Sequence, residues 1–399
     1  MKEELKPSLN ERWEVSGTEY SDFEEAIDLL TDCTSVTQFE PNEVILMSYS
    51  HEDDEAFYLD CHLRTGIKQK RLKKETLQEK NVPDVIIDEF RSGSRLMLLL
   101  DRKITAFTSP NLIGTLSARM NLSGTALFNP SLKRDAYMSE LLYEKHMPIN
   151  IVSRKIDDCT KVFAAHSDGY PYIPQTVLLD IADGLSGNKE LGNPLCKNWN
   201  INHSISSLYI EFPEFADDVS KVYNLPDVMT PGVILMTSDV GDCSVSCIGT
   251  WKIKGSRIVQ SVYKRRHRGN VSAKDVLAEI DKEVFSVYRK LPERLAQLIM
   301  IDVPDPAAAI DYAVSNSGVN EIGKKAAAEL KACLISEINP AIDYTAYDIV
   351  SSVMSVPDRV QGLPAPAVQK LSTVVLKTAF LKWETFVNKK QKSTIVLTA

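Results

Sequence analysis

Apolar and polar positions along the chain follow two periods, and segments of the two kinds alternate. A period of two, typical of half-buried strands, recurs through the first half of the chain. Apolar residues three or four apart, as at Phe23, Ala26, Ile27 and Leu30, predict helices between the strands. Strands are predicted at 43–49, 56–63, 95–100, 104–108, 149–156, 161–165 and 205–212, and helices at 22–30, 131–146 and 175–181, with another starting at Ser109-Pro110.

The clearest pattern is a strand–strand–strand–helix unit in the second half of the chain. Turn-forming residues separate its strands. Ser272 and Asp275 resemble a capping box, with Asp in place of Glu or Gln, and a helix with an apolar stripe follows. This order predicts a meander covered by one helix. The predicted strands are 231–237, 243–253 and 257–264, and the helix continues to about residue 291.

Meander order predominates over strand–helix–strand alternation, so the predicted fold class is α+β with an antiparallel or mixed sheet. After Pro306 the chain is rich in Ala and predicted to be helical. The stretch 184–200 is rich in Gly and Asn and is the best candidate for an internal boundary. The predicted regions are an acidic N-terminal α/β region (1–94), an α+β middle domain (95–200), a β-meander plus helix (201–303) and a helical C-terminal region (304–399).

The charge balance changes this picture, because it is uneven along the chain. The formal net charge is −8, and residues 1–60 hold seventeen Asp and Glu against only Lys2, Lys6 and Arg12. No apolar run is long enough to cross a membrane, and the N-terminus lacks a secretory signal. Seven widely spaced cysteines fit reduced thiols in a cytoplasm better than a disulfide framework.

The strongest local signal for function is the segment 251–268, which has seven cations and no acid. Cations neutralise phosphates and aromatic rings stack on bases, so the segment predicts binding of single-stranded DNA or RNA. A hairpin would present alternate residues, 257, 259, 261, 263 and 265, on one face. The alternatives are a solubilising edge strand and a contact for an acidic protein. The predicted nucleic-acid-binding residues are Trp251, Lys252, Lys254, Arg257, Tyr263, Lys264, Arg265, Arg266, His267 and Arg268.

Other chemistry has weak support in the sequence. Cys243 and Cys247 would lie about 13 Å apart on a strand, which is too far for one zinc ion. His166, Ser167 and Asp168 are triad residue types, but a turn is the more economical interpretation. Neither a phosphate-binding loop nor a nucleophile elbow occurs. We therefore predict no catalytic residue, metal or cofactor, and favour a protein that is not an enzyme.

Three stretches resemble a widespread, uncharacterised family of phage- and plasmid-borne proteins, over roughly residues 95–380. Each motif is short, and their colinear order carries the resemblance. The first stretch is a helix pair at 122–146, followed by Val152-Ser-Arg154 and Phe163-Ala-Ala-His-Ser-Asp-Gly-Tyr170. The second is Thr237-Ser-Asp-Val-Gly241, followed by Arg265-Arg-His-Arg-Gly269. The third is Tyr344-Thr-Ala-Tyr-Asp-Ile349. Candidate site residues in the first stretch are Arg154, Lys155, Ser167, Asp168 and Tyr170.

The resemblance implies a mobile-element origin, and hence the cytoplasm of a bacterial host cell, but no particular reaction. The strand–strand–strand–helix order is also similar in topology to the core of single-strand annealing proteins, which is a fold-level analogy. The first hypothesis is a single-stranded nucleic-acid-binding protein, such as a recombination or annealing accessory. The alternatives are an interaction protein that inhibits a host defence factor, with a host or phage protein as partner, and a divergent metal-dependent nuclease. A homo-oligomer is compatible with each.

Overall fold

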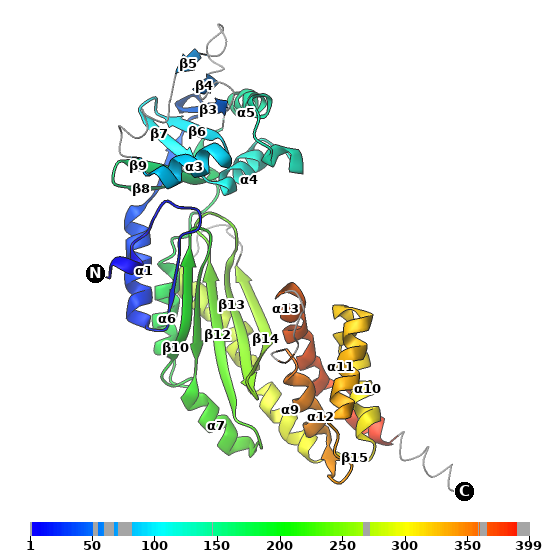
Figure 1. Cartoon of the computed structure of the whole chain (residues 1–399). Coiled ribbons are helices and arrows are strands. Elements are labelled where there is room, and N and C mark those ends of the chain that lie inside the picture. Colours follow the sequence, from blue (N-terminus) through cyan, green and yellow to red (C-terminus); the bar gives the residue numbers. More distant parts are fainter. Residues whose placement is uncertain are drawn as a thin grey trace.

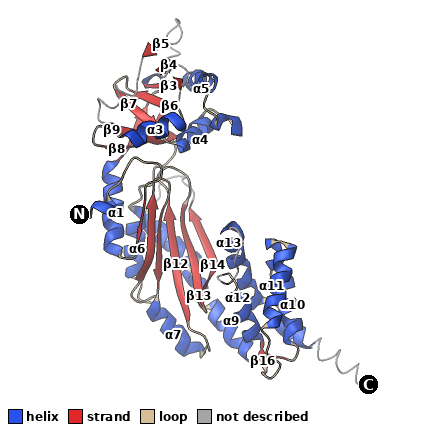
Figure 2. Cartoon of the chain, in the orientation of Figure 1, coloured by secondary structure: helices blue, strands red, loops and turns tan. Residues whose placement is uncertain are grey.

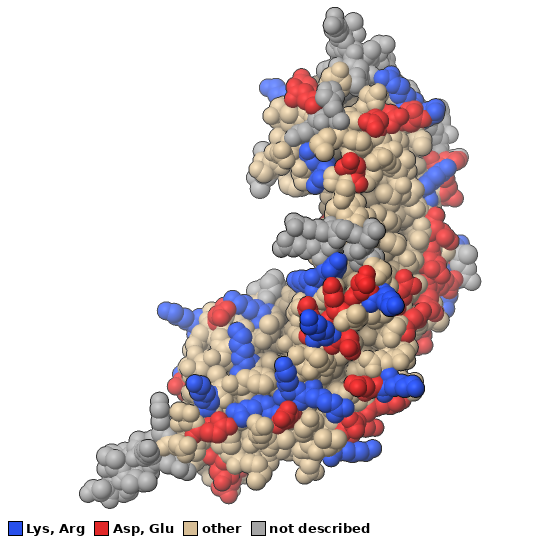
Figure 3. Space-filling view, turned by 180° about the vertical axis from the view of Figure 1, so that it is seen from behind, with Lys and Arg blue, Asp and Glu red and all other residues tan. Residues whose placement is uncertain are grey.

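The computed structural model describes residues 2–50, 55–59, 68–70, 82–145, 147–265, 272–357, 359 and 365–388. These residues form an eight-stranded sheet, a six-stranded sheet and a group of C-terminal helices (Figure 1). The predicted α+β class, with antiparallel and mixed sheets and a helical C-terminal region, is confirmed. Figure 3 shows a hollow on one side of the molecule, between the part that holds the eight-stranded sheet and the rest.

The eight-stranded sheet is mixed. Strands β7 and β9 pair in parallel, and the other neighbours are antiparallel. In spatial order the strands are β2 (Thr34–Phe39), β8 (Ile149–Ile156), β9 (Cys159–Ser167), β7 (Ile104–Thr108), β6 (Leu96–Leu100), β3 (Val44–Ser50), β4 (Glu55–Leu59) and β5 (Lys68–Lys70).

Helices cover both faces of this sheet. Helix α3 (Asp84–Ser92) packs its apolar stripe on one face, and α4 (Pro110–Arg119) and α5 (Leu132–Lys145) pack on the other. Because both faces are covered, all five residues of β6 are buried, which explains its unbroken apolar sequence. Helix α4 begins as predicted, with the Ser109 hydroxyl accepting a hydrogen bond from the Asn111 N–H and Pro110 in the first turn.

The six-stranded sheet is antiparallel throughout, and within the described chain the helices that pack on it lie on one face. Figure 2 shows its strands in front of the helices that pack behind them. The strands in spatial order are β1 (Glu14–Gly17), β10 (Leu195–Asn202), β11 (Ser206–Glu211), β12 (Met229–Thr237), β13 (Val245–Ile253) and β14 (Ser256–Arg265). The covering helices are α1 (Tyr20–Cys33), α6 (Val177–Ser186), α7 (Pro213–Tyr223) and α8 (Ala273–Glu283).

The C-terminal helices continue the core of the six-stranded sheet. Buried Trp383 and Leu371 belong to the same apolar cluster as Trp251 in the sheet. The elements are α9 (Lys290–Ile299), α10 (Pro306–Asn316), α11 (Lys324–Ser336), α12 (Ala346–Met354), α13 (Ala365–Val374), the 3-10 helix η6 (Val375–Phe380) and a short ribbon of β15 (Asp302–Val303) and β16 (Tyr344–Thr345).

The eight-stranded sheet is inserted into the sequence of the six-stranded one. The chain forms β1 and α1, crosses to the other sheet for β2 to β9, and returns for α6 and β10. Strands β1 and β10 are spatial neighbours, with Glu14 paired to Asn202. Pairing between β3 and β6 crosses residues 94/95, and pairing between β10 and β11 crosses residues 200/201.

The meander near 231–291 has the predicted order. Strands β12, β13 and β14 pair in sequence, and Ser272 caps α8 by accepting a hydrogen bond from the Asp275 N–H at 3.1 Å. The stretch 184–200 is less irregular than predicted, since α6 runs to Ser186 and β10 starts at Leu195. Parts of the predicted strand 56–63 lie outside the described residues.

Candidate functional site

The two aromatic residues of the predicted nucleic-acid hairpin lie in the core. Trp251 is 0 % exposed and packs against Phe215 and Tyr288, while Tyr263 is 3 % exposed. The Tyr263 hydroxyl donates a hydrogen bond to Glu279 of α8. Since a base can stack only on an accessible ring, this burial argues against the stacking role predicted for both residues.

A β-bulge explains why the strict alternation predicted for β14 does not hold. The register between β13 and β14 shifts at Gly249, so Gln260 is an extra residue in β14. Before the bulge, Arg257 and Val259 lie on the uncovered face of the sheet; after it, that face carries Val262 and Lys264. Tyr263 and Arg265, which the alternation placed beside Arg257, instead face the helices, where Arg265 pairs with Glu279 at 3.0 Å.

Most described cations of the hairpin have a partner within the molecule. Lys252 lies 4.0 Å from Glu211 and Lys254 lies 3.4 Å from Asp227. The Arg257 guanidinium stacks on Tyr209, with its carbon 3.7 Å from the ring centroid. Lys264 is exposed. Arg266, His267 and Arg268 lie outside the described residues.

The uncovered face of the six-stranded sheet is apolar at its centre and basic toward β14. Strand pairing places Ile234, Ile248 and Val262 in one row across the centre, and Val262 is 44 % exposed. Polar residues occupy the β1 and β10 side of this face. We call it the open sheet face, defined by the residues Asn198, Asn200, Ser207, Ile234, Met236, Ile248, Lys252, Arg257, Val259, Val262 and Lys264.

Two of the motifs that carry the family resemblance meet between the sheets. Arg154 of β8 is 0 % exposed, and its guanidinium donates hydrogen bonds of 2.9 Å to both carboxylate oxygens of Asp239, just beyond β12. The guanidinium also stacks on the Phe163 ring at 4.5 Å. Sequence-distant charges thus form a buried ion pair, in which the guanidinium nitrogen Nη2 donates to both carboxylate oxygens.

Further side chains complete this buried network. Gln175 donates a hydrogen bond to Asp239 and accepts one from the Ser206 hydroxyl. Arg154 donates to His203 Nδ1 at 2.8 Å and to the His203 carbonyl at 3.0 Å. We call Arg154, Asp239, His203, Gln175 and Ser206 the junction network, since they come from both sheets and from the segment before α6.

His203 is held in its neutral form by these contacts. Nδ1 must accept because arginine can only donate, so the ring proton is on Nε2, which donates to the Asn10 carbonyl at 2.9 Å. Burial, and then the nearby Arg154 charge, lower the pKa of His203 to about 3. A proton on Nδ1 would face the guanidinium, so acid should weaken the network.

We expect this histidine to make stability depend on pH between its unfolded and folded pKa values. Between about pH 6.5 and about pH 3 the unfolded state binds a proton that the folded state does not. The free energy of unfolding therefore decreases as the pH is lowered through this range. At pH 5 the loss is about 2 kcal/mol relative to neutral pH. His203→Gln, which keeps one acceptor and one donor, should flatten this part of the urea-unfolding profile; parallel profiles of the two proteins would contradict it.

The N-terminal segment crosses the junction as a strap, residues 9–13. The Leu9 carbonyl accepts a hydrogen bond from Lys161 Nζ at 2.8 Å, and the Glu11 N–H donates to Glu89 of α3. Lys161 is 2 % exposed, and its Nζ also lies 2.5 Å from Glu11 and 3.1 Å from Glu89. The strap therefore ties the eight-stranded sheet to the loop that holds His203.

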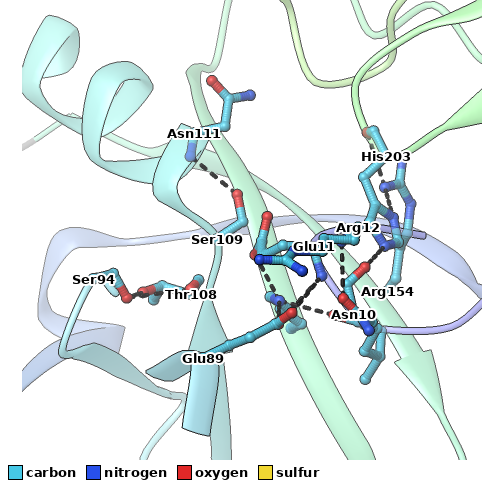
Figure 4. Close-up of polar contacts among 12 residues, drawn as sticks. Asn10, Glu11, Arg12, Glu89, Ser94, Thr108, Ser109, Asn111, Arg154 and His203 are labelled. Carbon is cyan, nitrogen blue, oxygen red and sulfur yellow. Dashed lines mark hydrogen bonds and ion pairs between the residues drawn. The ribbon is translucent and has the colours of Figure 1, made fainter. Parts of the chain in front are cut away.

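Two clefts flank the strap. Figure 4 shows Asn10, Glu11 and Arg12 between Ser109 on one side and Arg154 and His203 on the other. The larger cleft has a volume of about 390 Å³ and the smaller one about 200 Å³. Residues that line the larger cleft include Arg12, Ser109, Asn111, Phe163 and His203. Arg12 is exposed and lines both. The buried charges pair with one another beneath these clefts, so the arrangement is suited to joining the sheets.

The other candidates of the first resemblance motif are dispersed. Lys155 is exposed at the end of β8, and Asp168 accepts a hydrogen bond from the Gly169 N–H in a turn. The Tyr170 ring stacks on His166 at 4.0 Å between centroids, against Gly241, where a side chain would meet His166. Ser167 ends β9. Of these residues only Arg154 enters the junction network.

Sequence reasoning missed Lys161, Glu11, Glu89 and His203. A signal existed for Lys161, because it lies in a strand between Cys159 and Phe163, the two apolar residues two positions away on the same face. Glu11, Glu89 and His203 lie in segments whose composition is typical of exposed surface, and their partners are far away in sequence. Charged residues usually indicate surface, so such a network leaves little local trace.

In the described part of the chain, no three His, Cys, Asp or Glu side chains are placed to hold a metal ion. No helix of this part is long and apolar enough to span a membrane. No family model matches the chain, and neither a curated protein nor a solved structure matches it.

Proposed function

We propose that the protein binds single-stranded nucleic acid on the open sheet face. The observation that carries the proposal is that helices cover one face of the six-stranded sheet, while the other presents Lys252, Arg257 and Lys264 beside an apolar centre. Phosphates would pair with the cations, and bases would lie over Ile234, Ile248 and Val262. Five spacings of about 4.8 Å make the sheet roughly 24 Å wide, room for a short segment of several nucleotides.

The bulge in β14 supports this placement. Without the extra residue Gln260, Lys264 would face the helices; with it, Lys264 joins Arg257 on the open sheet face. Strand β14 thus contributes a cation to the open sheet face on each side of the bulge, Arg257 before it and Lys264 after it. Lys254, Arg265 and the buried rings of Trp251 and Tyr263 have structural partners and are outside the proposed contact surface.

Charge reversal at Lys252 and Lys264 is the test of the proposal. Both side chains are exposed, so the double variant should fold, and it should bind labelled single-stranded DNA or RNA at least tenfold more weakly in fluorescence anisotropy. Each lost phosphate contact should also reduce the slope of log affinity against log salt by about 0.7.

The matched control reverses Lys274 and Lys282 on the helix-covered side, where Figure 3 shows Lys and Arg interspersed with acids. This variant changes the net charge equally and should bind like the parent. Equal losses in both variants would mean that only bulk charge matters. Absence of binding by the parent protein would overturn the proposal.

A protein partner is the second candidate, favoured by the acidic side of α1. Glu24, Asp28 and Asp32 lie on this helix, and the pKa of Glu24 is raised by burial and by neighbouring Asp183 and Asp28. Figure 3 shows red side chains along the corresponding edge of the molecule. This acidic surface suits a basic partner, such as the host factor in the inhibitor hypothesis.

A further inference from the structure

Strand β2 forms one edge of the eight-stranded sheet and is unusually exposed. It pairs with β8 along its whole length, from Thr34 opposite Arg154 to Phe39 opposite Ile149, without a bulge. Its outer side pairs with no strand of the described chain. The four central residues Ser35–Gln38 are all exposed, so both faces of the strand are accessible as well as its edge.

The other edges carry the features that prevent edge-to-edge pairing. Strand β5 has three residues with the sequence Lys-Gln-Lys, and β1 has four residues and begins with Glu14. Strand β14 has a bulge and three cations, and α13 contacts it. Natural sheets protect their edges by short strands, charges, bulges or a covering element.

Strand β2 has none of these features. Its six residues, Thr-Ser-Val-Thr-Gln-Phe, include no charge, proline or glycine, and three of them are β-branched. Such a strand is a ready template for another extended segment. Since the other described edges of the two large sheets carry such features, β2 stands out among them as an interaction surface.

We propose that β2 is the contact of a homodimer, in which the β2 strand of a second copy pairs with it antiparallel. Pairing two identical strands antiparallel about a two-fold axis near Val36 is isologous, the commonest arrangement in oligomers, and closes after two chains. The two eight-stranded sheets would then become one continuous sheet. The proposal does not depend on nucleic-acid binding by the open sheet face, which belongs to the other sheet.

The charges beside β2 favour a second copy over an unrelated strand. Exposed Lys155 lies just past the start of β2 on the neighbouring strand, and exposed Glu40 lies just past its end. With the two-fold axis between Val36 and Thr37, an antiparallel copy places Glu40 of one chain opposite Cys33 of the other, on the same face as Lys155 of the next strand, and the axis repeats this approach at the other end. No charge of β2 itself opposes the pairing.

Sedimentation analysis of the full chain, over about a hundredfold range of concentration, tests the proposal. The parent should be a dimer that dissociates on dilution. Val36→Lys combined with Thr37→Lys puts like charges face to face and should weaken dimerisation about tenfold or more. Val222→Lys combined with Val228→Lys, at positions 59 % and 73 % exposed, adds the same charge, is the matched control and should dimerise like the parent.

Charge exchange identifies the partner strand. Lys155→Glu alone and Glu40→Lys alone should each weaken the dimer, and the double variant should restore it. Amide exchange at residues 35–38 should slow as protein concentration rises, whereas a dimer formed elsewhere would leave it unchanged. A parent that stays monomeric, or a dimer that the paired lysines at 36 and 37 do not weaken, would overturn the proposal.

Discussion

Replacing Arg154 with methionine is expected to lower the free energy of unfolding by about 3–5 kcal/mol, because one member of a buried ion pair is removed. The Asp239 carboxylate would remain buried, with only Gln175 as a side-chain donor among the junction network. His203 Nδ1 would lose its donor as well. The cost comes mainly from the unpaired charge, not from the lost attraction.

Urea unfolding followed by tryptophan fluorescence measures this effect, since the Trp13 ring lies 5.1 Å from His203. Lys133→Met is the matched control: this residue is exposed on α5, away from both proposed contact surfaces, so the change should stay within about 0.5 kcal/mol. Adding Asp239→Leu to Arg154→Met removes the stranded carboxylate and should recover part of the loss. A loss below about 1 kcal/mol for Arg154→Met would contradict the assigned role.

Trp251→Ala is expected to cost about 3–5 kcal/mol of stability, the range for truncating a large buried aromatic residue. The ring is fully buried against Phe215 and Tyr288, and its Nε1 donates a hydrogen bond of 2.5 Å to Gln260 in the bulge. Loss of the ring therefore leaves a cavity and frees the residue that sets the register of β14.

The milder Trp251→Phe separates stability from binding. It should retain a folded protein, with a smaller destabilisation, and its affinity for single-stranded nucleic acid should match that of the parent. If the ring instead stacked on a base, its replacement would remove part of an interaction worth about 1–3 kcal/mol. A clear fall in affinity for a variant that remains folded would show that Trp251 contributes to nucleic-acid binding.

Helices, strands and turns were largely predictable from the sequence, because the spacing of apolar residues in them follows a clear period. The hairpin of β8 and β9, the three-strand meander and the caps of α4 and α8 each depend on residues close together in the chain. The face of β14 was not predictable by the same reasoning. A bulge breaks the period of two, and Gln260 has no feature that distinguishes it from a surface residue of a regular strand.

The arrangement of the sheets could not be predicted, because it rests on pairs distant in sequence. Glu14 pairs with Asn202 and Thr34 with Arg154, and neither contact leaves a local pattern. The junction network is of the same kind. Arg154 and Asp239 belong to motifs noted for a family resemblance, but only the fold shows that they form one ion pair.

The insertion of one sheet into the sequence of the other also sets an order of events during synthesis. Helix α1 presents a stripe of four apolar residues, each at most 1 % exposed in the folded chain, to the six-stranded sheet. Apart from β1, the strands of that sheet begin at Leu195, about 160 residues after α1 ends, which at cellular elongation rates is roughly 10–30 s. The segment from β2 to β9 can form its own sheet during this interval, while the apolar stripe of α1 remains exposed on the nascent chain. Chaperone binding near the N-terminus should therefore end only when β10 and β11 have left the ribosome.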